Sequence, residues 1–334
     1  MKASRTVALV LILVTLTLVA GGAVAQGPPV KIGYIPSDSF AVLYLMADRY
    51  LTPDGINAQM VRLPGGAEIA AQVATGQLQV GGSGMGAAGF NAVAAKLPVE
   101  FVAPLHYGYL EDYFTVRKAA WGSQIKRIAD LRGRPVALNT RGAAVEWMLD
   151  QVLRRDGLTI KDVQVKIMPF PDMVPALESG AVDAGILTEP FPTLAEDKGV
   201  GVRPLPRPAG AKAIPITATF WNSEWAKANG DLAHKVMLGY VRAARDLAAN
   251  GGGGWHEDRN VDVIVKYTNA KREVVMKARP HVVDPNLELD TSTLDSMQKL
   301  NADLGYLKYT EFLPADRLFT WTYRDRAVRE LGRR

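Results

Sequence analysis

Apolar and polar positions near the start of the chain switch between the spacing of a strand and that of a helix. Residues 30–35 predict a strand, and residues 40–51 carry apolar side chains along one helical face. A second strand is expected at 55–63, a short helix at 67–75 and a third strand at 78–81. Because strands alternate with helices, this order predicts a parallel sheet.

The same order returns in the middle of the chain. Strands are expected at 135–139, 163–168 and 182–187, with helices at 142–156 and 172–179. One constant shift also superimposes related residues of the two blocks, among them Ile32 on Val136, Ile69 on Met173 and Gly76 on Gly180. The repetition predicts two α/β lobes of like design.

Segments rich in β-forming residues connect the two blocks. Residues 99–106 and 112–117 predict a crossover from one lobe to the other, and residues 214–222 predict the return. The C-terminal part predicts helices without intervening strands, which must pack on another element and are expected to cover the first lobe and the hinge. The expected division is a leader at 1–25, lobe one with the C-terminal helices at 26–110 and 218–334, and lobe two at 111–217.

Residues 1–25 have the composition of a secretory signal peptide. Lys2 and Arg5 precede an apolar run at 7–20, and Ala23-Val24-Ala25 offers small residues for cleavage before Gln26. The alternative is a membrane anchor, but the apolar run is shorter than the roughly 20 residues that a spanning helix needs. We therefore expect a protein that is exported to a bacterial periplasm with its leader removed.

Composition argues against several classes of function. The 334 residues are 48% hydrophobic and 22% charged, as in globular proteins. The net charge of +5 comes without a long cluster of Lys or Arg, so we expect no nucleic-acid partner. The chain has no cysteine, which excludes thiol nucleophiles and iron–sulfur clusters, and its four histidines share no metal-binding spacing. Motifs of hydrolases, phosphate loops and zinc proteases are also missing, so we expect no cofactor and no metal.

Candidate ligand-binding residues lie in the segments that follow the predicted strands. Ligands of open parallel sheets bind beyond the carboxyl ends of the strands, and two facing lobes would bring two such ends together. The candidates from lobe one and the first crossover are Ser37, Asp38, Phe40, Gly66, Ser83, Gly84, Met85 and Tyr109. Those from lobe two are Asn139, Thr140, Arg141, Gly142 and Glu189.

The charged candidates favour opposite ligands, and each has an ordinary structural alternative. Arg141, at the start of a helix, would suit an acid or could lie solvated at the rim. Glu189 would suit a cationic or hydrogen-donating group, or could cap the helix that begins at Pro190. The charge of the ligand therefore stays open.

Glycines and aromatic residues also allow more than one interpretation. Gly82-Ser83-Gly84 could bring backbone N–H groups close to an anionic head group, or could form only a tight turn. The run from 82 to 87 fits the dinucleotide pattern G-x-G-x-x-A, but that fingerprint belongs after the first strand of its domain and this run follows the third. Aromatic residues near the strand exits could stack a planar ligand or belong to the core, among them Tyr34, Tyr107, Tyr113 and Trp221.

Four stretches, in this order along the chain, resemble one family. They are Lys31-Ile32-Gly33-Tyr34-Ile35-Pro36, Leu131-Arg132-Gly133-Arg134-Pro135-Val136-Ala137, Leu177-Glu178-Ser179-Gly180-Ala181-Val182-Asp183-Ala184 and Glu189-Pro190-Phe191. The chain is similar to the solute-binding proteins of ABC transporters, in the branch of nitrate, sulfonate, taurine and thiamine-precursor binders.

This resemblance implies the type II periplasmic binding protein fold, with two lobes, two hinge crossovers and a ligand cleft between them. It further implies a small-molecule solute and an ABC permease in the inner membrane as partners, and we expect a monomer. An enzyme that makes the thiamine pyrimidine is similar in its first lobe, but its cysteine-rich iron-binding stretch has no counterpart here. The alternative from another class is an exported enzyme that uses Asp38, Glu189 or His106 as acid or base in the same cleft.

Overall fold

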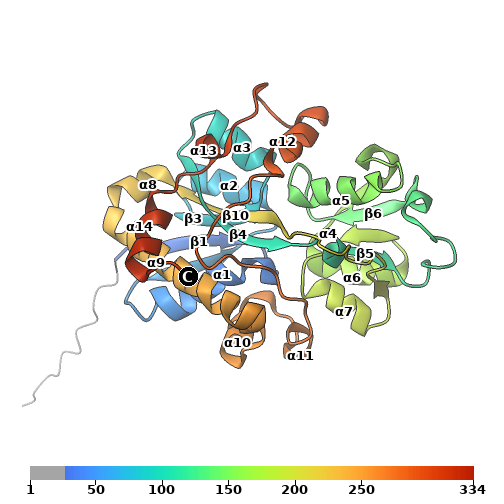
Figure 1. Ribbon diagram of the computed structural model, residues 1–334, viewed down its shortest axis with the longest axis horizontal. Helices are drawn as coiled ribbons and strands as arrows, with labels where there is room; N and C mark the ends of the chain where they lie inside the picture. The colour runs from blue at the N-terminus through green and yellow to red at the C-terminus, as the bar shows by residue number, and fades with distance from the viewer. Residues whose placement is uncertain (1–26) are drawn as a thin grey trace, which may run out of the picture.

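Two lobes, each built on a five-stranded sheet, make up residues 27–334, which the computed structural model describes (Figure 1). The predicted signal peptide lies outside the described residues. The two-lobe α/β architecture expected from the repetition is confirmed. Within residues 27–334, no helix combines the length and the apolar character that crossing a membrane requires.

The sheet of lobe one has the strand order β2-β1-β3-β10-β4. Its strands are β1 (Val30–Tyr34), β2 (Ala58–Arg62), β3 (Val80–Gly84), β4 (Val99–Gly108) and β10 (Ile214–Asn222). The first three are parallel, as the sequence predicts, whereas β10 runs antiparallel between β3 and β4. The return strand therefore completes the first sheet, and an expected lobe boundary between residues 217 and 218 falls inside β10.

The sheet of lobe two repeats this arrangement in the order β7-β6-β8-β5-β9. Its strands are β5 (Phe114–Arg117), β6 (Pro135–Leu138), β7 (Gln164–Ile167), β8 (Ala184–Ile186) and β9 (Gly201–Val202). Here β6, β7 and β8 are parallel and β5 is antiparallel to both of its neighbours. Each lobe thus receives one antiparallel strand next to its third parallel strand, so both sheets are mixed.

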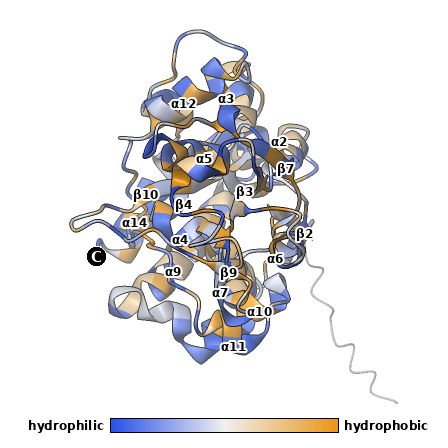
Figure 2. Ribbon diagram, turned by 90° about the vertical axis from the view of Figure 1, so that its right-hand side faces the viewer, coloured by the Kyte–Doolittle hydropathy of each residue, from blue (hydrophilic) through white to orange (hydrophobic). Residues whose placement is uncertain are grey.

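Helices cover both sheets. In lobe one and the first crossover they are η1 (Asp38–Phe40), α1 (Ala41–Leu45), η2 (Met46–Leu51), α2 (Gly66–Ala74), α3 (Ala87–Ala94) and α4 (Leu110–Tyr113). In lobe two they are η3 (Ile128–Leu131), α5 (Ala144–Arg154), η4 (Ile160–Asp162), α6 (Phe170–Ser179) and α7 (Phe191–Asp197). Figure 2 shows apolar and polar residues along the same helices, for example α5, as expected where one face packs on a core.

The C-terminal helices surround lobe one (Figure 1). They are α8 (Ser223–Ala228), α9 (Gly230–Gly252), η5 (Gly253–His256), α10 (Asp258–Thr268), α11 (Arg272–Val275), α12 (Leu294–Asp303), α13 (Ala315–Leu318) and α14 (Thr322–Leu331). Helix α9 packs on η2, α1 and α14. Two of these helices also reach lobe two, because α11 contacts α7 and α12 contacts α5.

One local prediction differs from the structure. Gly82, Ser83 and Gly84 were expected in a loop after the third strand, but they belong to β3. They form a strand because residues 217–219 of β10 pair with them antiparallel. That partner lies far away in the sequence, so no local pattern indicates it.

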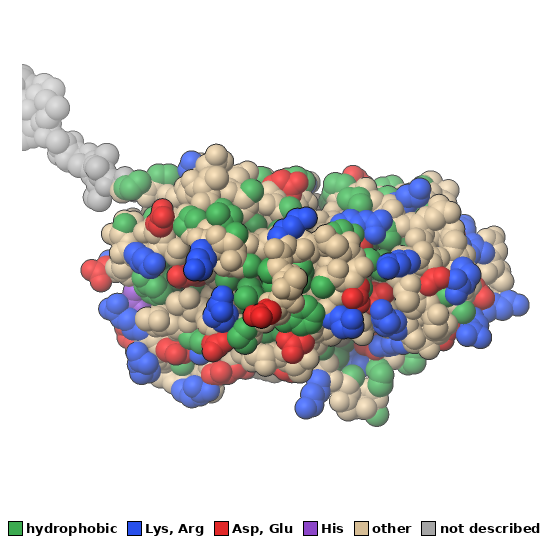
Figure 3. Space-filling model, turned by 90° about the horizontal axis from the view of Figure 1, so that it is seen from above, with side chains coloured by type: hydrophobic (Ala, Val, Ile, Leu, Met, Phe, Trp, Pro, Cys, Tyr) green, Lys and Arg blue, Asp and Glu red, His purple; other side chains and the backbone are tan. Residues whose placement is uncertain are grey.

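Charged side chains of both signs are distributed over the surface. Figure 3 shows basic and acidic groups interspersed over one face of the molecule. This distribution agrees with the nearly balanced composition of 39 Lys and Arg against 34 Asp and Glu. The expectation that nucleic acid is not a partner stays a prediction.

Candidate functional site

A cavity of about 590 Å³, its open mouth included, lies between the two lobes. Residues beyond the carboxyl ends of β1, β3, β6 and β8 contribute to its wall, and the middle of the long strand β10 completes it. The strand ends of both lobes therefore meet at one place.

Most of the sequence-predicted site residues line this cavity. They are Ser37, Phe40, Gly66, Ser83, Gly84, Asn139, Thr140, Arg141 and Gly142. The remaining lining residues are Ile35, Ser39, Ala67, Gly86, Ala88, Ala143, Val145, Phe170, Thr188, Ile216 and Thr217. Ile216 and Thr217 carry no local signal, because β10 reaches the cavity only by pairing with β3 and β4.

Four predicted site residues do not line the cavity. Met85 is fully buried in the core, and its backbone N–H donates to the carbonyl of Ile216. The ring of Tyr109 lies at the first crossover, 3.6 Å from the guanidinium carbon of Arg207. The other two, Asp38 and Glu189, are buried carboxylates with partners inside the protein.

The partners of these two carboxylates explain their positions. Asp38 accepts a hydrogen bond from Nε2 of His281 at 2.8 Å. Glu189 pairs with Arg203 at 2.5 Å, and both side chains are only 2% exposed. Burial raises the pKa of Glu189, and Arg203 opposes this shift. A buried carboxylate needs such a partner, so these two residues serve the fold at this place.

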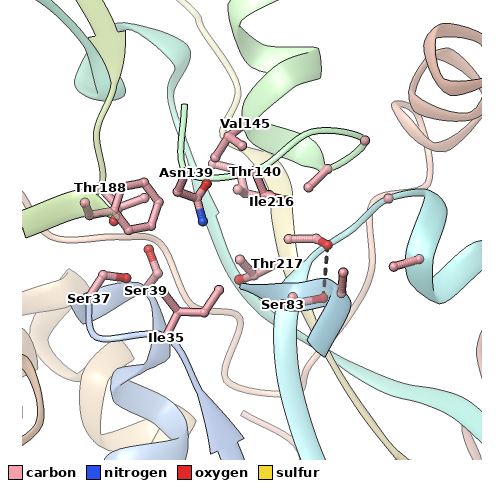
Figure 4. A pocket seen from close by; sticks show the side chains of 18 of the residues that line it. Ile35, Ser37, Ser39, Ser83, Asn139, Thr140, Val145, Thr188, Ile216 and Thr217 are labelled. Carbon is pink, nitrogen blue, oxygen red and sulfur yellow. Dashed lines mark hydrogen bonds between the residues drawn. The ribbon is translucent and has the colours of Figure 1, made fainter. Parts of the chain in front are cut away.

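Uncharged polar side chains from both lobes surround the centre of the cavity (Figure 4). The hydroxyls of Ser37 in lobe one and Thr188 in lobe two are buried and have no hydrogen-bond partner. The side-chain oxygen of Asn139 is likewise buried and without a partner. These three atoms belong to a group of eight such atoms in the described part of the chain. A buried polar group without a partner costs free energy, so a bound molecule could supply the missing hydrogen bonds.

Several helices begin at the cavity. Gly66 and Phe170 are the first residues of α2 and α6, and Gly86 and Ala143 precede α3 and α5. The free N–H groups of a helix N-terminus carry partial positive charge. The cavity therefore favours electronegative ligand atoms at these points.

Arg141 is the only charged side chain among the described residues that line the cavity, and it has an acidic partner. Its Nη1 lies 2.8 Å from Oε1 of Glu146. The other oxygen of Glu146 accepts the backbone N–H of Gly142 at 2.7 Å. The side chain of Glu146 is 1% exposed and that of Arg141 44% exposed. Arg141, a candidate from the sequence, lines the cavity, but no local pattern indicated its ion pair with Glu146.

The two lobes touch beside the cavity. The backbone N–H of Ala87 in lobe one donates to the carbonyl of Gly142 in lobe two at 2.7 Å. A Cβ atom at Gly86 would lie 2.1 Å from that same carbonyl oxygen. A residue without a side chain is therefore required for this close approach.

A buried chain of hydrogen bonds connects the cavity wall with the C-terminal part. Thr217 contacts Nδ1 of His106 at 2.5 Å, and Nε2 of His106 lies 3.1 Å from the hydroxyl of Tyr113. That hydroxyl contacts His281 at 2.8 Å, and His281 reaches Asp38. Sequence reasoning missed this role of His281, which lies more than 160 positions from Tyr113.

The two histidines of this chain differ in their pKa. Burial, with a smaller effect of the neighbouring His281, lowers the pKa of His106 well below its ordinary value. Burial, the largest single influence, would also lower the pKa of His281, but the carboxylates of Asp38, Glu189 and Asp112 together outweigh it and the pKa is raised. Among residues 27–334, no three His, Asp or Glu side chains gather in a group that could hold a metal ion.

The family model described as NMT1/THI5 like matches residues 39–251. The putative aliphatic sulfonates-binding protein of Escherichia coli (strain K12) is 25% identical over 189 residues. The match covers 56% of this chain and 56% of that protein, so this chain spans about half the length of the curated relative.

Solved structures share the fold at low sequence identity. The alkanesulfonate-binding protein of Xanthomonas axonopodis pv. citri has a TM-score of 0.63 at 19% identity, with 88% of this chain and 98% of that chain covered. The periplasmic nitrate-binding protein of Synechocystis PCC 6803 has a TM-score of 0.69 at 14% identity, with 91% and 89% covered. The ligand-binding component of an ABC-type import system from Staphylococcus aureus has a TM-score of 0.71 at 14% identity, with 90% and 98% covered. The chain belongs to the NMT1/THI5-like family and has the two-lobe fold of periplasmic binding proteins.

Proposed function

We propose that this protein is the substrate-binding component of an ABC importer and captures a small organic solute between its lobes. The observation that carries this proposal is a cavity in which both lobes offer buried polar atoms without a partner, Ser37 from lobe one and Thr188 from lobe two. Relatives named as sulfonate-binding and nitrate-binding proteins support the same role. The proposed solute contacts are Ser37, Phe40, Gly66, Ser83, Gly84, Asn139, Thr140, Arg141, Gly142 and Thr188.

Closure of the two lobes is the mechanism of capture. A solute that contacts Ser37 and Thr188 at the same time binds the closed form more tightly than the open form, and this difference shifts the population. Residues 109–113 and 203–213 link the two sheets and would carry the backbone rotation. The contact between Ala87 and Gly142 then forms only when the lobes close.

The cellular role follows from this mechanism. The protein would be exported by its leader, work in the periplasm as a monomer and deliver the solute to a permease in the inner membrane. Structural relatives described as periplasmic binding proteins support this localisation. The permease would recognise the closed form, because bound solute stabilises this form and the empty protein favours the open one.

An enzyme is the second candidate function. A desulfurization enzyme has a TM-score of 0.59 at 15% identity, so the fold can also serve catalysis. In this chain, however, Asp38, Glu189 and His106 are not among the residues that line the cavity. Each of these possible acids or bases is engaged by a side chain of the protein itself. The geometry therefore favours binding without turnover.

Native mass spectrometry of the protein purified from its own host tests the proposal. We expect an additional small mass that leaves on unfolding and is recovered chemically unchanged. The double variant Ser37→Ala/Thr188→Val should lose this mass while keeping the circular dichroism spectrum of the wild type. Protein that never carries a small molecule, or that converts the released compound into a product, would contradict the binding role.

A further inference from the structure

We propose that the solute carries no net negative charge and that the buried carboxylate of Glu146 sets this selectivity. This inference rests on the proposed binding function and names the chemical class of its solute. It differs from what the names of the relatives would suggest, since those proteins are named for sulfonates and nitrate.

The cation at the cavity is already neutralised. Arg141 is the only charged residue among the described lining residues, and Glu146 holds its guanidinium at 2.8 Å. The carboxylate is 1% exposed, so solvent screens this pair little from the side of the acid. An anionic solute would have to compete with a fixed carboxylate of the protein for the same guanidinium.

Glu146 also fills the place where lobe two could bind an anion through its backbone. Helix α5 begins at Ala144, and the N–H of Gly142, directly before it, donates to Oε2 of Glu146 at 2.7 Å. An N–H group at the start of a helix is a natural partner of a negative ligand. Here the chain supplies the negative group itself.

Two further carboxylates stand next to the unpartnered hydroxyls. Asp38 follows Ser37 and Glu189 follows Thr188, and the two segments run side by side because the N–H of Asp38 donates to the carbonyl of Glu189 at 3.0 Å. Asp38 is paired with His281 and Glu189 with Arg203. A negative head group between Ser37 and Thr188 would therefore lie near two carboxylates. The cationic partners of these carboxylates are already paired with them and are not available to the ligand.

The groups that remain available fit an uncharged molecule. Serine and threonine hydroxyls and the amide of Asn139 can each donate and accept hydrogen bonds, as an amide, an alcohol or a ring N–H of a ligand requires. Apolar side chains complete the wall and suit an apolar body, namely Ile35, Phe40, Val145, Phe170 and Ile216. Partial charges at the helix N-termini stabilise a carbonyl or hydroxyl oxygen without demanding a full negative charge.

Thermal denaturation and calorimetry with ethanesulfonate and sodium nitrate test the inference. The wild type should show neither a rise in melting temperature nor heat of binding with either anion at millimolar concentration. Glu146→Gln keeps the size of the side chain and frees Arg141, so it should bind ethanesulfonate measurably, at least about tenfold more tightly than the detection limit that the wild type fails to reach, which corresponds to about 1.4 kcal/mol or more. The double variant Arg141→Gln/Glu146→Gln should lose this gain.

The control is Glu178→Gln, the same chemical change at an exposed pair in the same lobe, where Glu178 lies 3.7 Å from Lys198. It should behave as the wild type with both anions. Should Glu146→Gln fail to fold, Glu146→Ser also leaves Arg141 without its acid and takes its place. Saturable binding of either anion to the wild type, or an unchanged response in folded Glu146 variants, would overturn the inference. Anion binding by the wild type would leave the proposed binding function intact, whereas a wild type that never carries a solute in native mass spectrometry would remove that function.

Discussion

The two lobes share one strand order but differ in the length of their strands. Lobe one contains the long strands β4 and β10. It also buries a cluster of aromatic rings, in which the ring centroid of Phe101 lies 5.5 Å from that of Phe220 and 5.2 Å from that of Phe319. Lobe two has strands of two to four residues and relies on ion pairs in addition to its apolar core. Asp183, for example, lies between Arg117 at 2.7 Å and Arg134 at 3.1 Å.

This difference changes how charges near the cavity are interpreted. In lobe two, Arg141, Glu189 and Arg203 all lie at or near the strand exits, and each has a partner of opposite charge in the same lobe. A small lobe with short strands uses these pairs to fix its loops. The charge of a residue beside a cleft is therefore no guide to the charge of the ligand until its partners are known.

The largest expected effect comes from breaking the buried ion pair of lobe two. Arg203→Met leaves Glu189 buried without its cation, and we expect the free energy of unfolding to fall by about 3–5 kcal/mol in urea denaturation. Because burial already raises the pKa of Glu189, lowering the pH should protonate it and recover part of this loss. The control Lys198→Met removes an ion pair that is about half exposed and should cost less than about 1 kcal/mol. Equal losses in the two variants would show that lobe two does not depend on its buried pair.

The contact between the lobes is the next most sensitive point. Gly86→Ala adds a Cβ atom 2.1 Å from the carbonyl oxygen of Gly142, so the lobes cannot close fully. We expect affinity for the copurified solute to fall by about 100-fold in calorimetry, equivalent to about 2.8 kcal/mol, with each lobe still folded. Gly230→Ala is the matched control, because no atom lies within 4 Å of its added Cβ. Wild-type affinity in Gly86→Ala would contradict the role of this contact in closure.

The free energy of unfolding should depend on pH because lobe one buries the imidazole of His106 in its neutral form. The pKa of His106 is well below its ordinary value of 6.5, so the folded protein excludes a proton that the unfolded chain binds as the pH falls below that value. Stability should therefore decrease on acidification from pH 6.5, by up to about 1.4 kcal/mol per pH unit. The raised pKa of His281 acts in the opposite direction and partly offsets this loss near pH 6.5, where the unfolded chain binds that proton only in part; the offset fades as the pH falls further, because His281 is then protonated in both states.

His106→Gln should flatten this pH dependence between pH 6.5 and 5.5. Urea denaturation at several pH values measures the slope, and NMR titration of the wild type should show His106 still neutral at pH 6. A slope that stays the same after substitution would assign the acid sensitivity to other groups.

The smallest expected effect distinguishes a hydroxyl that is available to bind a ligand from a hydroxyl that stabilises the fold. Thr188→Val removes an unpartnered hydroxyl, so solute affinity should fall by about tenfold while the melting temperature of the empty protein stays the same or rises. Thr193→Val removes a hydroxyl that donates to Glu189 at 2.9 Å and should lower the melting temperature instead. If both variants lose stability alike, the Thr188 hydroxyl is not reserved for a ligand.

Much of the fold was predictable because its signals are local. The spacing of apolar residues around Ile32 and Val136 indicates strands, and Gly180 ends α6 with a positive φ of 77°. Repetition of these signals predicted two lobes, and the rule for strand ends placed Ser37, Asn139 and Arg141 at the cavity. Such patterns depend on neighbours in the sequence, so the sequence by itself determined them.

Only the tertiary structure decided which polar groups are free. Asp38 and His281 are 243 positions apart, and β10 joins β3 across more than a hundred residues. Whether a carboxylate meets a cation of the protein or remains available for a solute depends on distances of a few ångströms between such distant segments. Local periodicity contains no information on these distances, and that is why the sequence located the cleft but left its charge open.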